Sequence, residues 1–89
     1  HGGLGRFSAD KPLSAYDLNE LVWTRPDCSV PWTDDPDRYM VVGHTPTQLI
    51  SGKAEIFWKN QYIFIDCGAC MEGGVLACLC LDTMKAFYV

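Results

Sequence analysis

The pattern of apolar and polar positions divides the chain into a first part with helix signals and a second part with strand signals. In KPLSAYDLNELVW (11–23), apolar residues recur at roughly helical spacing, which predicts a short helix. Ser14 followed by Asp17 three residues later has the form of a capping box at its start. Arg25 directly precedes Pro26, and a residue before proline disfavours helical angles, so the helix should end before this pair.

After an exposed loop predicted by the prolines and aspartates of residues 28–38, the pattern changes to strands. YMVVGH (39–44) is an apolar run of strand length that ends at a glycine and His44. Residues 54–66 predict one hairpin around Lys59-Asn60, and residues 75–89 predict a second that reverses near residues 82–84. Four or five antiparallel strands after one short helix indicate the α+β class.

The predicted strands are apolar on both faces, as in LACLCL (76–81). Strands of this kind are covered by a layer on each side. A chain of 89 residues barely supplies one such layer, because small domains bury a limited share of their surface. We therefore expect residues 1–89 to form a single partial domain that has a covering layer missing.

Composition narrows the functional classes. The net charge of −4 argues against a nucleic-acid binder, which needs a basic face to neutralise phosphates. No apolar run approaches the ~20 residues of a membrane span, so no membrane association is expected. Five cysteines are an odd count and a poor disulfide framework, which favours reduced thiols packed in the core or loops of a cytoplasmic protein. They are Cys28, Cys67, Cys70, Cys78 and Cys80.

Several side chains are candidates for chemistry. The two histidines, His1 and His44, each lie beside glycine, and histidine is the commonest metal ligand, although a single loop histidine is more often solvated. Asp66 stands between an apolar strand and a glycine turn, where a carboxylate either acts in a site or fixes the turn. The CGAC string (67–70) has redox or zinc spacing, yet its surroundings favour core or loop thiols. DDPD (34–37) lacks the glycine and distal glutamate of a calcium loop and predicts a solvated turn.

Four longer strings occur in order: HGGL (1–4), LVWTRPD (21–27), MVVGHTPTQ (40–48) and FIDCGACMEGGVLACLCLDT (64–83). Together they resemble the C-terminal half of bacterial serine/threonine protein phosphatases of the calcineurin-like metallophosphoesterase superfamily. The resemblance covers essentially the whole chain. The family's first half carries an aspartate-x-histidine pair, a GDxxDRG string and a GNHE string, none of which occurs in these residues. The resemblance therefore implies a fragment that begins inside its enzyme.

The family fold is a β-sandwich flanked by helices, with two divalent ions at the C-terminal ends of strands. The resemblance implies that His1 and His44 are ligands of the second ion, with their imidazoles side by side, while a bridging aspartate and an asparagine come from the other half. Manganese is the first expectation for the metal, with iron or zinc as alternatives. Two ions about 3.5–4 Å apart can clamp a phosphoryl group and acidify a bridging water. Arg25 matches an arginine that binds the substrate phosphate; the alternative is a cation that stabilises the C-terminus of the helix.

The expected function is a fragment of a metal-dependent phosphoprotein phosphatase, inactive by itself, whose substrates are a phosphorylated protein or small phosphate monoesters. One alternative is a dinucleoside polyphosphate hydrolase of the same superfamily. Another is a small metal-binding interaction module built on the Cys/His set, and a third is a folded remnant that self-associates through an uncovered sheet face.

Overall fold

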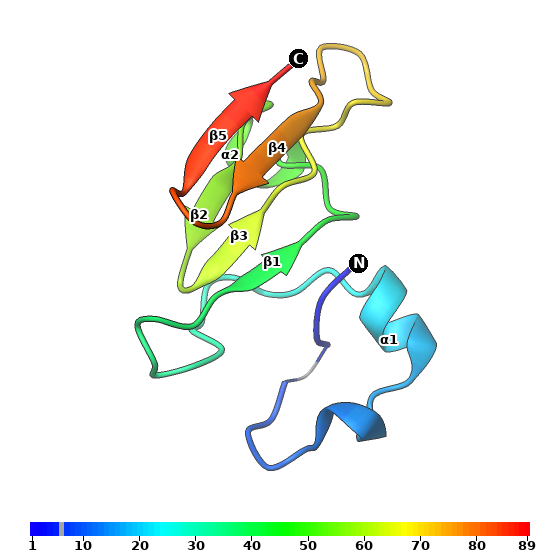
Figure 1. The fold of residues 1–89 in the computed structure, drawn as a ribbon. Helices are drawn as coiled ribbons and strands as arrows, with labels where there is room; N and C mark the ends of the chain where they lie inside the picture. Colours follow the sequence, from blue (N-terminus) through cyan, green and yellow to red (C-terminus); the bar gives the residue numbers. More distant parts are fainter. Residues whose placement is uncertain (6) are drawn as a thin grey trace.

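The computed structural model describes residues 1–5 and 7–89, which form a small α+β domain with two sheets (Figure 1). The elements in chain order are the 3-10 helix η1 (Leu13–Ala15), helix α1 (Leu18–Trp23), strand β1 (Met40–Val42), helix α2 (Gln48–Ser51), strand β2 (Phe57–Lys59), strand β3 (Tyr62–Phe64), strand β4 (Ala77–Cys80) and strand β5 (Lys85–Tyr88). The expected α+β class is confirmed. None of the helices in the described part of the chain has the length and apolarity that crossing a membrane requires.

The first sheet has the strand order β1-β3-β2, and the second is the hairpin β4-β5. Strands β2 and β3 are antiparallel, with Asn60 and Gln61 at positive φ in the turn between them, one residue later than predicted. Strand β1 pairs parallel with β3, whereas the other two strand pairs are antiparallel, so the strands are mostly antiparallel, as expected. The chain makes this parallel pair by crossing through α2 and β2 between the two strands. Both predicted hairpins are confirmed.

Strand β3 is the centre of the core, because its side chains are buried on both faces of the sheet. Tyr62 and Phe64 pack with Val42 on one face, and partly buried side chains from the loop before β1, including Trp32, cover them. Ile63 packs on the opposite face with Ile56 and Cys67. The hairpin β4-β5 covers that second face, which places β3 between two layers (Figure 1). This central strand therefore matches the two-layer expectation.

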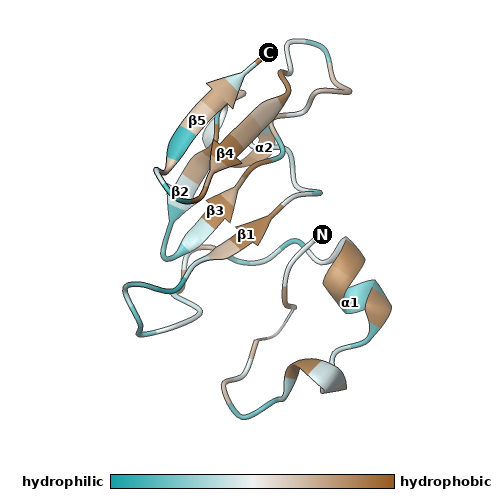
Figure 2. Ribbon diagram, in the orientation of Figure 1, coloured by the Kyte–Doolittle hydropathy of each residue, from teal (hydrophilic) through white to brown (hydrophobic). Residues whose placement is uncertain are grey.

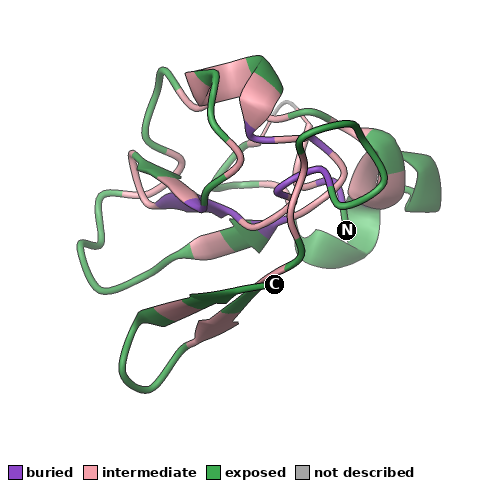
Figure 3. Cartoon of the chain, turned by 90° about the horizontal axis from the view of Figure 1, so that it is seen from above, coloured by how far each residue is buried: buried purple, intermediate pink, exposed green. Residues whose placement is uncertain are grey.

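The hairpin β4-β5 is covered on one face by the first sheet. Ala77, Leu79 and Ala86 face the sheet, while the alternate positions face away from it. We call the residues that face away from the sheet the outer hairpin face. They are Leu76, Cys78, Cys80, Lys85, Phe87 and Val89. Most of this face is exposed (Figure 3), and β4 is strongly apolar (Figure 2). The described residues thus supply a layer on only one side of LACLCL, and the expectation that a further covering layer lies outside them stays a prediction.

The predicted helix over 11–23 is interrupted. Tyr16 adopts an extended conformation between η1 and α1, so the α-helix starts only at Leu18. The capping box is formed by Asp17, whose carboxylate accepts from the Glu20 N–H at 2.8 Å while Glu20 accepts from the Asp17 N–H at 3.0 Å. Ser14 therefore does not cap it, contrary to the prediction. The helix ends at Trp23, before Arg25 and Pro26, as predicted.

Helix α2 was not predicted, because four residues are too few to show a period. Its signals are Pro46 before its start and Gly52 at its end, where φ is +79° and only glycine fits without strain. The cysteines are all free thiols, but only Cys67 is buried. Cys28 and Cys80 are half-buried, whereas Cys70 and Cys78 are exposed, so the expectation of core packing was wrong for Cys78.

The capping box can be tested by substitution. Asp17→Ala is expected to lower the free energy of unfolding by about 1 kcal/mol, because it removes the acceptor for the Glu20 N–H. Ser14→Ala, at the position that the sequence pattern favoured, should change it by less than about 0.5 kcal/mol. Urea denaturation followed by circular dichroism measures both, and equal losses in the two variants would contradict the assignment.

Candidate functional site

The two histidines lie together although they are far apart in the sequence. The imidazole ring centroids of His1 and His44 are 5.4 Å apart, and the rings are inclined at 53°. The indole of Trp23 also makes an edge-to-face contact with His44, with a centroid separation of 5.3 Å. The imidazole of His44 therefore contacts both a second imidazole and an indole, at ring separations typical of aromatic pairs.

Backbone hydrogen bonds hold the N-terminal segment in this place. The carbonyl oxygen of Leu21, in α1, accepts from the N–H of Gly2 at 2.9 Å and from the backbone nitrogen of His1 at 3.3 Å. On the other side, the carbonyl oxygen of His1 accepts from the N–H of Gly43 at 2.8 Å. The segment therefore connects the C-terminal turn of α1 to the end of β1, and this connection brings the two rings together.

Gly2 is required by this geometry. A Cβ atom at Gly2 would lie 2.6 Å from the carbonyl oxygens of Val22 and Thr24, which is too close for any side chain. A Cβ at Gly43 would lie 3.5 Å from the His1 ring, an ordinary contact. The first glycine of HGG thus lets the chain approach the end of α1, which is the physical reason for a glycine directly after the histidine.

His44 has a strained backbone. Its φ is +64°, and the N–H of Thr45 donates to the carbonyl oxygen of Gly43 at 2.6 Å, the bonding pattern of a γ-turn centred on His44. Residues other than glycine pay about 1–3 kcal/mol for such conformations, and they are concentrated at functional sites. The residues that follow His44 are well anchored: Thr47 is buried, its N–H donates to the Asp66 carbonyl oxygen at 2.8 Å, and its hydroxyl donates to the Lys53 carbonyl oxygen at 3.0 Å.

The parallel pairing of β1 and β3 places His44 and Asp66 beyond the C-terminal ends of neighbouring strands. The carboxylate of Asp66 accepts from the Gly68 N–H at 2.9 Å, which fixes the turn. The turn-fixing interpretation of Asp66 is therefore confirmed. Beside His44, the hydroxyl of Thr45 is buried and has no hydrogen-bond partner among the described residues, a feature that the sequence did not indicate.

Arg25 is exposed and lines a cavity of about 440 Å³ together with Leu4, Glu20 and Asp27. His1 lines a different cavity, so the structure brings the two histidines together but does not place Arg25 in the same cavity as His1. Helix α1 ends at Trp23 with Thr24 as its C-cap, so Arg25 lies outside the last helical turn and the helix-cation alternative loses support. Hydrogen bonds from the side chain and N–H of Ser29 lower the pKa of Asp27, which keeps a negative charge near Arg25.

Metal binding by this pair can be judged from the ring separation. Two imidazoles that share an ion, with metal–nitrogen bonds of about 2.1 Å and angles of 90–110°, have centroids roughly 4.6–5.3 Å apart. The observed separation of 5.4 Å lies just above this range. Within residues 1–5 and 7–89, no group of three or more His, Cys, Asp or Glu side chains could hold a metal. The described residues thus offer two imidazoles and no complete ligand set.

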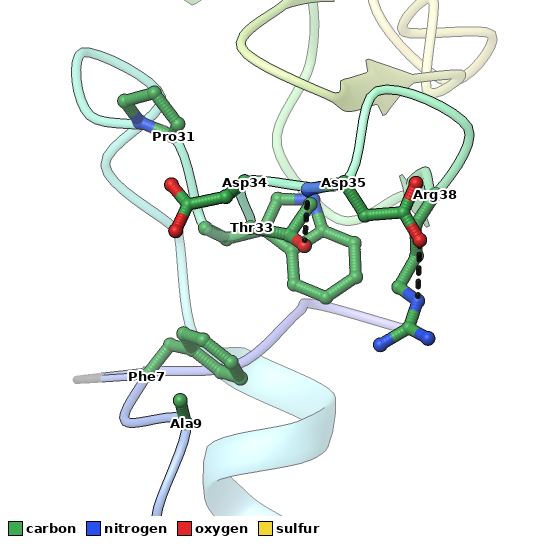
Figure 4. A pocket seen from close by; sticks show the side chains of 8 residues that line it. Phe7, Ala9, Pro31, Thr33, Asp34, Asp35 and Arg38 are labelled. Atoms are coloured by element: carbon green, nitrogen blue, oxygen red, sulfur yellow. Dashed lines mark hydrogen bonds and ion pairs between the residues drawn. The ribbon is translucent and has the colours of Figure 1, made fainter.

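The acidic loop predicted as a solvated turn is confirmed as one. Asp35 accepts from the Asp37 N–H at 2.9 Å and pairs with Arg38 at 3.8 Å, and the aspartates are exposed. Together with Phe7 and Trp32, this loop borders a cavity of about 400 Å³ (Figure 4). None of the residues that line this cavity is a histidine or a cysteine.

No family model, curated protein or solved structure matches the chain.

The strain at His44 can be measured by comparing two substitutions that both remove the imidazole. His44→Gly is expected to be more stable than His44→Ala by about 1 kcal/mol, because glycine adopts positive φ without a steric penalty. At Val41, an exposed β1 residue that is not among the positive-φ positions, the same pair should show the opposite order. Urea unfolding of the four variants provides the comparison, and an alanine variant at least as stable as the glycine variant at position 44 would refute the strain.

Proposed function

We propose that this chain is the C-terminal part of a calcineurin-like metallophosphoesterase that hydrolyses phosphate monoesters, with phosphoproteins as the leading substrate class. The observation that carries the proposal is the contact of the His1 and His44 imidazoles at 5.4 Å. The motif resemblance implies that these two side chains are ligands of the same metal ion. The strained, anchored backbone of His44 is a second, independent support, because strain of this kind is retained where function requires it.

In this proposal, His1 and His44 hold one divalent ion, with manganese as the first choice. Divalent ions in such enzymes activate water and stabilise the charge of the phosphoryl group. The remaining ligands come from a part of the protein outside these residues, the part that carries the family's other motifs. The chain's own contribution is to keep both imidazoles in place through the backbone bonds at Leu21 and Gly43, so that little ordering is needed when the ion binds.

Arg25 is the proposed phosphate ligand. A guanidinium has a planar pair of donors that matches two phosphate oxygens. The carboxylates Glu20 and Asp27 line the same cavity as Arg25, and these would repel a phosphate dianion. Glu20 is partly neutralised by Lys11 at 3.7 Å and by its capping bond. Productive binding of phosphate therefore depends on the cationic charge of the metal centre as well as on Arg25.

Metal binding by the histidine pair can be measured on the 89-residue chain. Co²⁺ bound at His44 should quench the fluorescence of Trp23, whose ring centroid is 5.3 Å away. His1→Ala and His44→Ala should each weaken the binding on the order of tenfold, the loss of about 1.4 kcal/mol from one ligand. Trp23→Phe should remove most of the quenching, because the other two tryptophans, Trp32 and Trp58, lie elsewhere in the fold. The variant should remain folded. Undiminished quenching in the His44→Ala variant would exclude the site.

The proposed hydrolysis has to be measured on the protein encoded by the complete reading frame. We expect that protein to hydrolyse p-nitrophenyl phosphate in the presence of Mn²⁺, to lose activity with a chelator and to regain it when Mn²⁺ is returned. Alanine at the position of His44 should reduce kcat/KM on the order of a hundredfold or more, since a ligand is lost. Ser14→Ala should retain full activity. Turnover of diadenosine tetraphosphate but not of phosphopeptides would replace the phosphoprotein assignment, and no metal-dependent hydrolysis of any phosphoester would refute the proposal.

A further inference from the structure

A cavity of about 490 Å³ lies between the N-terminal segment and the loop before β1. One wall comes from residues 4–13, and the other comes from Trp32 and residues 38–40. Its volume is within the range of small-molecule sites, about 300–1,000 Å³. Neither histidine is among the described residues that line it, so this cavity is separate from the site proposed for the metal ion.

The apolar lining of this cavity includes two aromatic rings that contact each other. The indole N–H of Trp32 donates to the carbonyl oxygen of Gln61 at 3.0 Å. The ring of Phe7 meets this indole edge-to-face, with centroids 5.6 Å apart and planes inclined at 88°. Both side chains are half-buried, so part of each ring is open to a ligand. A flat aromatic molecule can therefore pack against rings that are already in position.

The charged side chains that line the cavity are both cations, Lys11 and Arg38, and none of the lining residues that the structure describes is acidic. This is a local excess of positive charge in a chain whose net charge is −4. Each cation has one carboxylate partner from outside the lining: Lys11 pairs with Glu20 at 3.7 Å, and Arg38 pairs with Asp35 at 3.8 Å (Figure 4). Long ion pairs of this kind at a surface are weak, so both cations remain able to bind a further anion.

The cavity that Arg25 lines is different in this respect, because Glu20 and Asp27 are among its lining residues. It also has no aromatic side chain in its described lining. The two cavities therefore favour different ligands. A bare phosphate would make no use of the aromatic wall described here, and a neutral hydrocarbon would make no use of its cations.

We propose that this cavity binds a small aromatic carboxylate. The ring of the ligand packs against Phe7 and Trp32, and its carboxylate is bound by the cations Lys11 and Arg38. A guanidinium offers two parallel donors that match a carboxylate, and the apolar surroundings strengthen the attraction between the charges. The inference does not rest on the proposed phosphoesterase function, since it uses none of the residues assigned to that reaction.

The test titrates the ¹⁵N-labelled 89-residue chain with 2-naphthoate at neutral pH and follows the one-bond N–H spectrum by nuclear magnetic resonance. The indole N–H signal of Trp32, identified by its loss in Trp32→Phe, should shift with the ligand. The matched probe 2-naphthamide has the same rings without the charge and should bind on the order of tenfold more weakly. Equal affinity for the two probes would overturn the carboxylate assignment. The largest shifts on the outer hairpin face, or no shift at the solubility limit of 2-naphthoate, would overturn the site.

Variants of the two cations separate a local contact from the effect of net charge. Lys11→Gln and Arg38→Gln should each weaken 2-naphthoate binding about two- to fivefold, the worth of one charge pair near a surface, and should leave 2-naphthamide binding unchanged. Lys53→Gln removes the same charge at an exposed position outside the lining and should bind like the wild type. An equal loss in Lys53→Gln and Arg38→Gln would contradict the site. The dispersion of each spectrum shows whether the variant is folded.

Two further variants complete the comparison. Asp35→Asn keeps an oxygen that can accept from the Asp37 N–H but removes the charge that competes for Arg38, so it should bind 2-naphthoate at least as tightly as the wild type. His44→Ala should bind it with wild-type affinity, because His44 is not among the lining residues. Weaker binding in Asp35→Asn would contradict the role of Arg38. A loss in His44→Ala would place the ligand at the histidine pair and overturn the proposal.

Discussion

The fold depends on the backbone connection between the end of β1 and the C-terminal turn of α1. It consists of hydrogen bonds from the Gly2 N–H to the Leu21 carbonyl oxygen and from the Gly43 N–H to the His1 carbonyl oxygen. The same bonds place the two imidazoles in contact, so the element that joins the helical part to the sheet also builds the candidate site.

The sequence predicted the elements with a strong local signal. The two hairpins were readable because their apolar runs flank polar turn residues, and the end of α1 because a proline stands after Arg25. The parallel pairing of β1 with β3 was not readable, because pairing is decided by which side chains share the core, here Val42 with Tyr62 and Phe64. Local patterns carry no information on such long-range contacts.

In the candidate site, too, some features were predicted from the sequence and others were not. The motif strings predicted His1 and His44 as neighbours, and the structure places their rings in contact. The pattern of residues did not predict that Trp23 packs on His44, nor that His44 adopts positive φ, because residue type alone does not identify which non-glycine positions adopt it. Trp23 is 62% exposed, and this exposure alone would have suggested a surface residue. Its contact with His44 is therefore more informative than its exposure.

The strained conformation of His44 can persist because its surroundings determine it several times over. Strain of about 1–3 kcal/mol is offset when a few hydrogen bonds of about 1 kcal/mol each and two ring contacts all require the same geometry. Those bonds come from Gly43 on one side and from buried Thr47 on the other, and the rings are those of His1 and Trp23. Both imidazoles are also stable in contact without an ion, since aromatic rings pack at this distance by themselves. It follows that a ligand of the pair meets side chains already in position, and that its binding energy is not spent on ordering them.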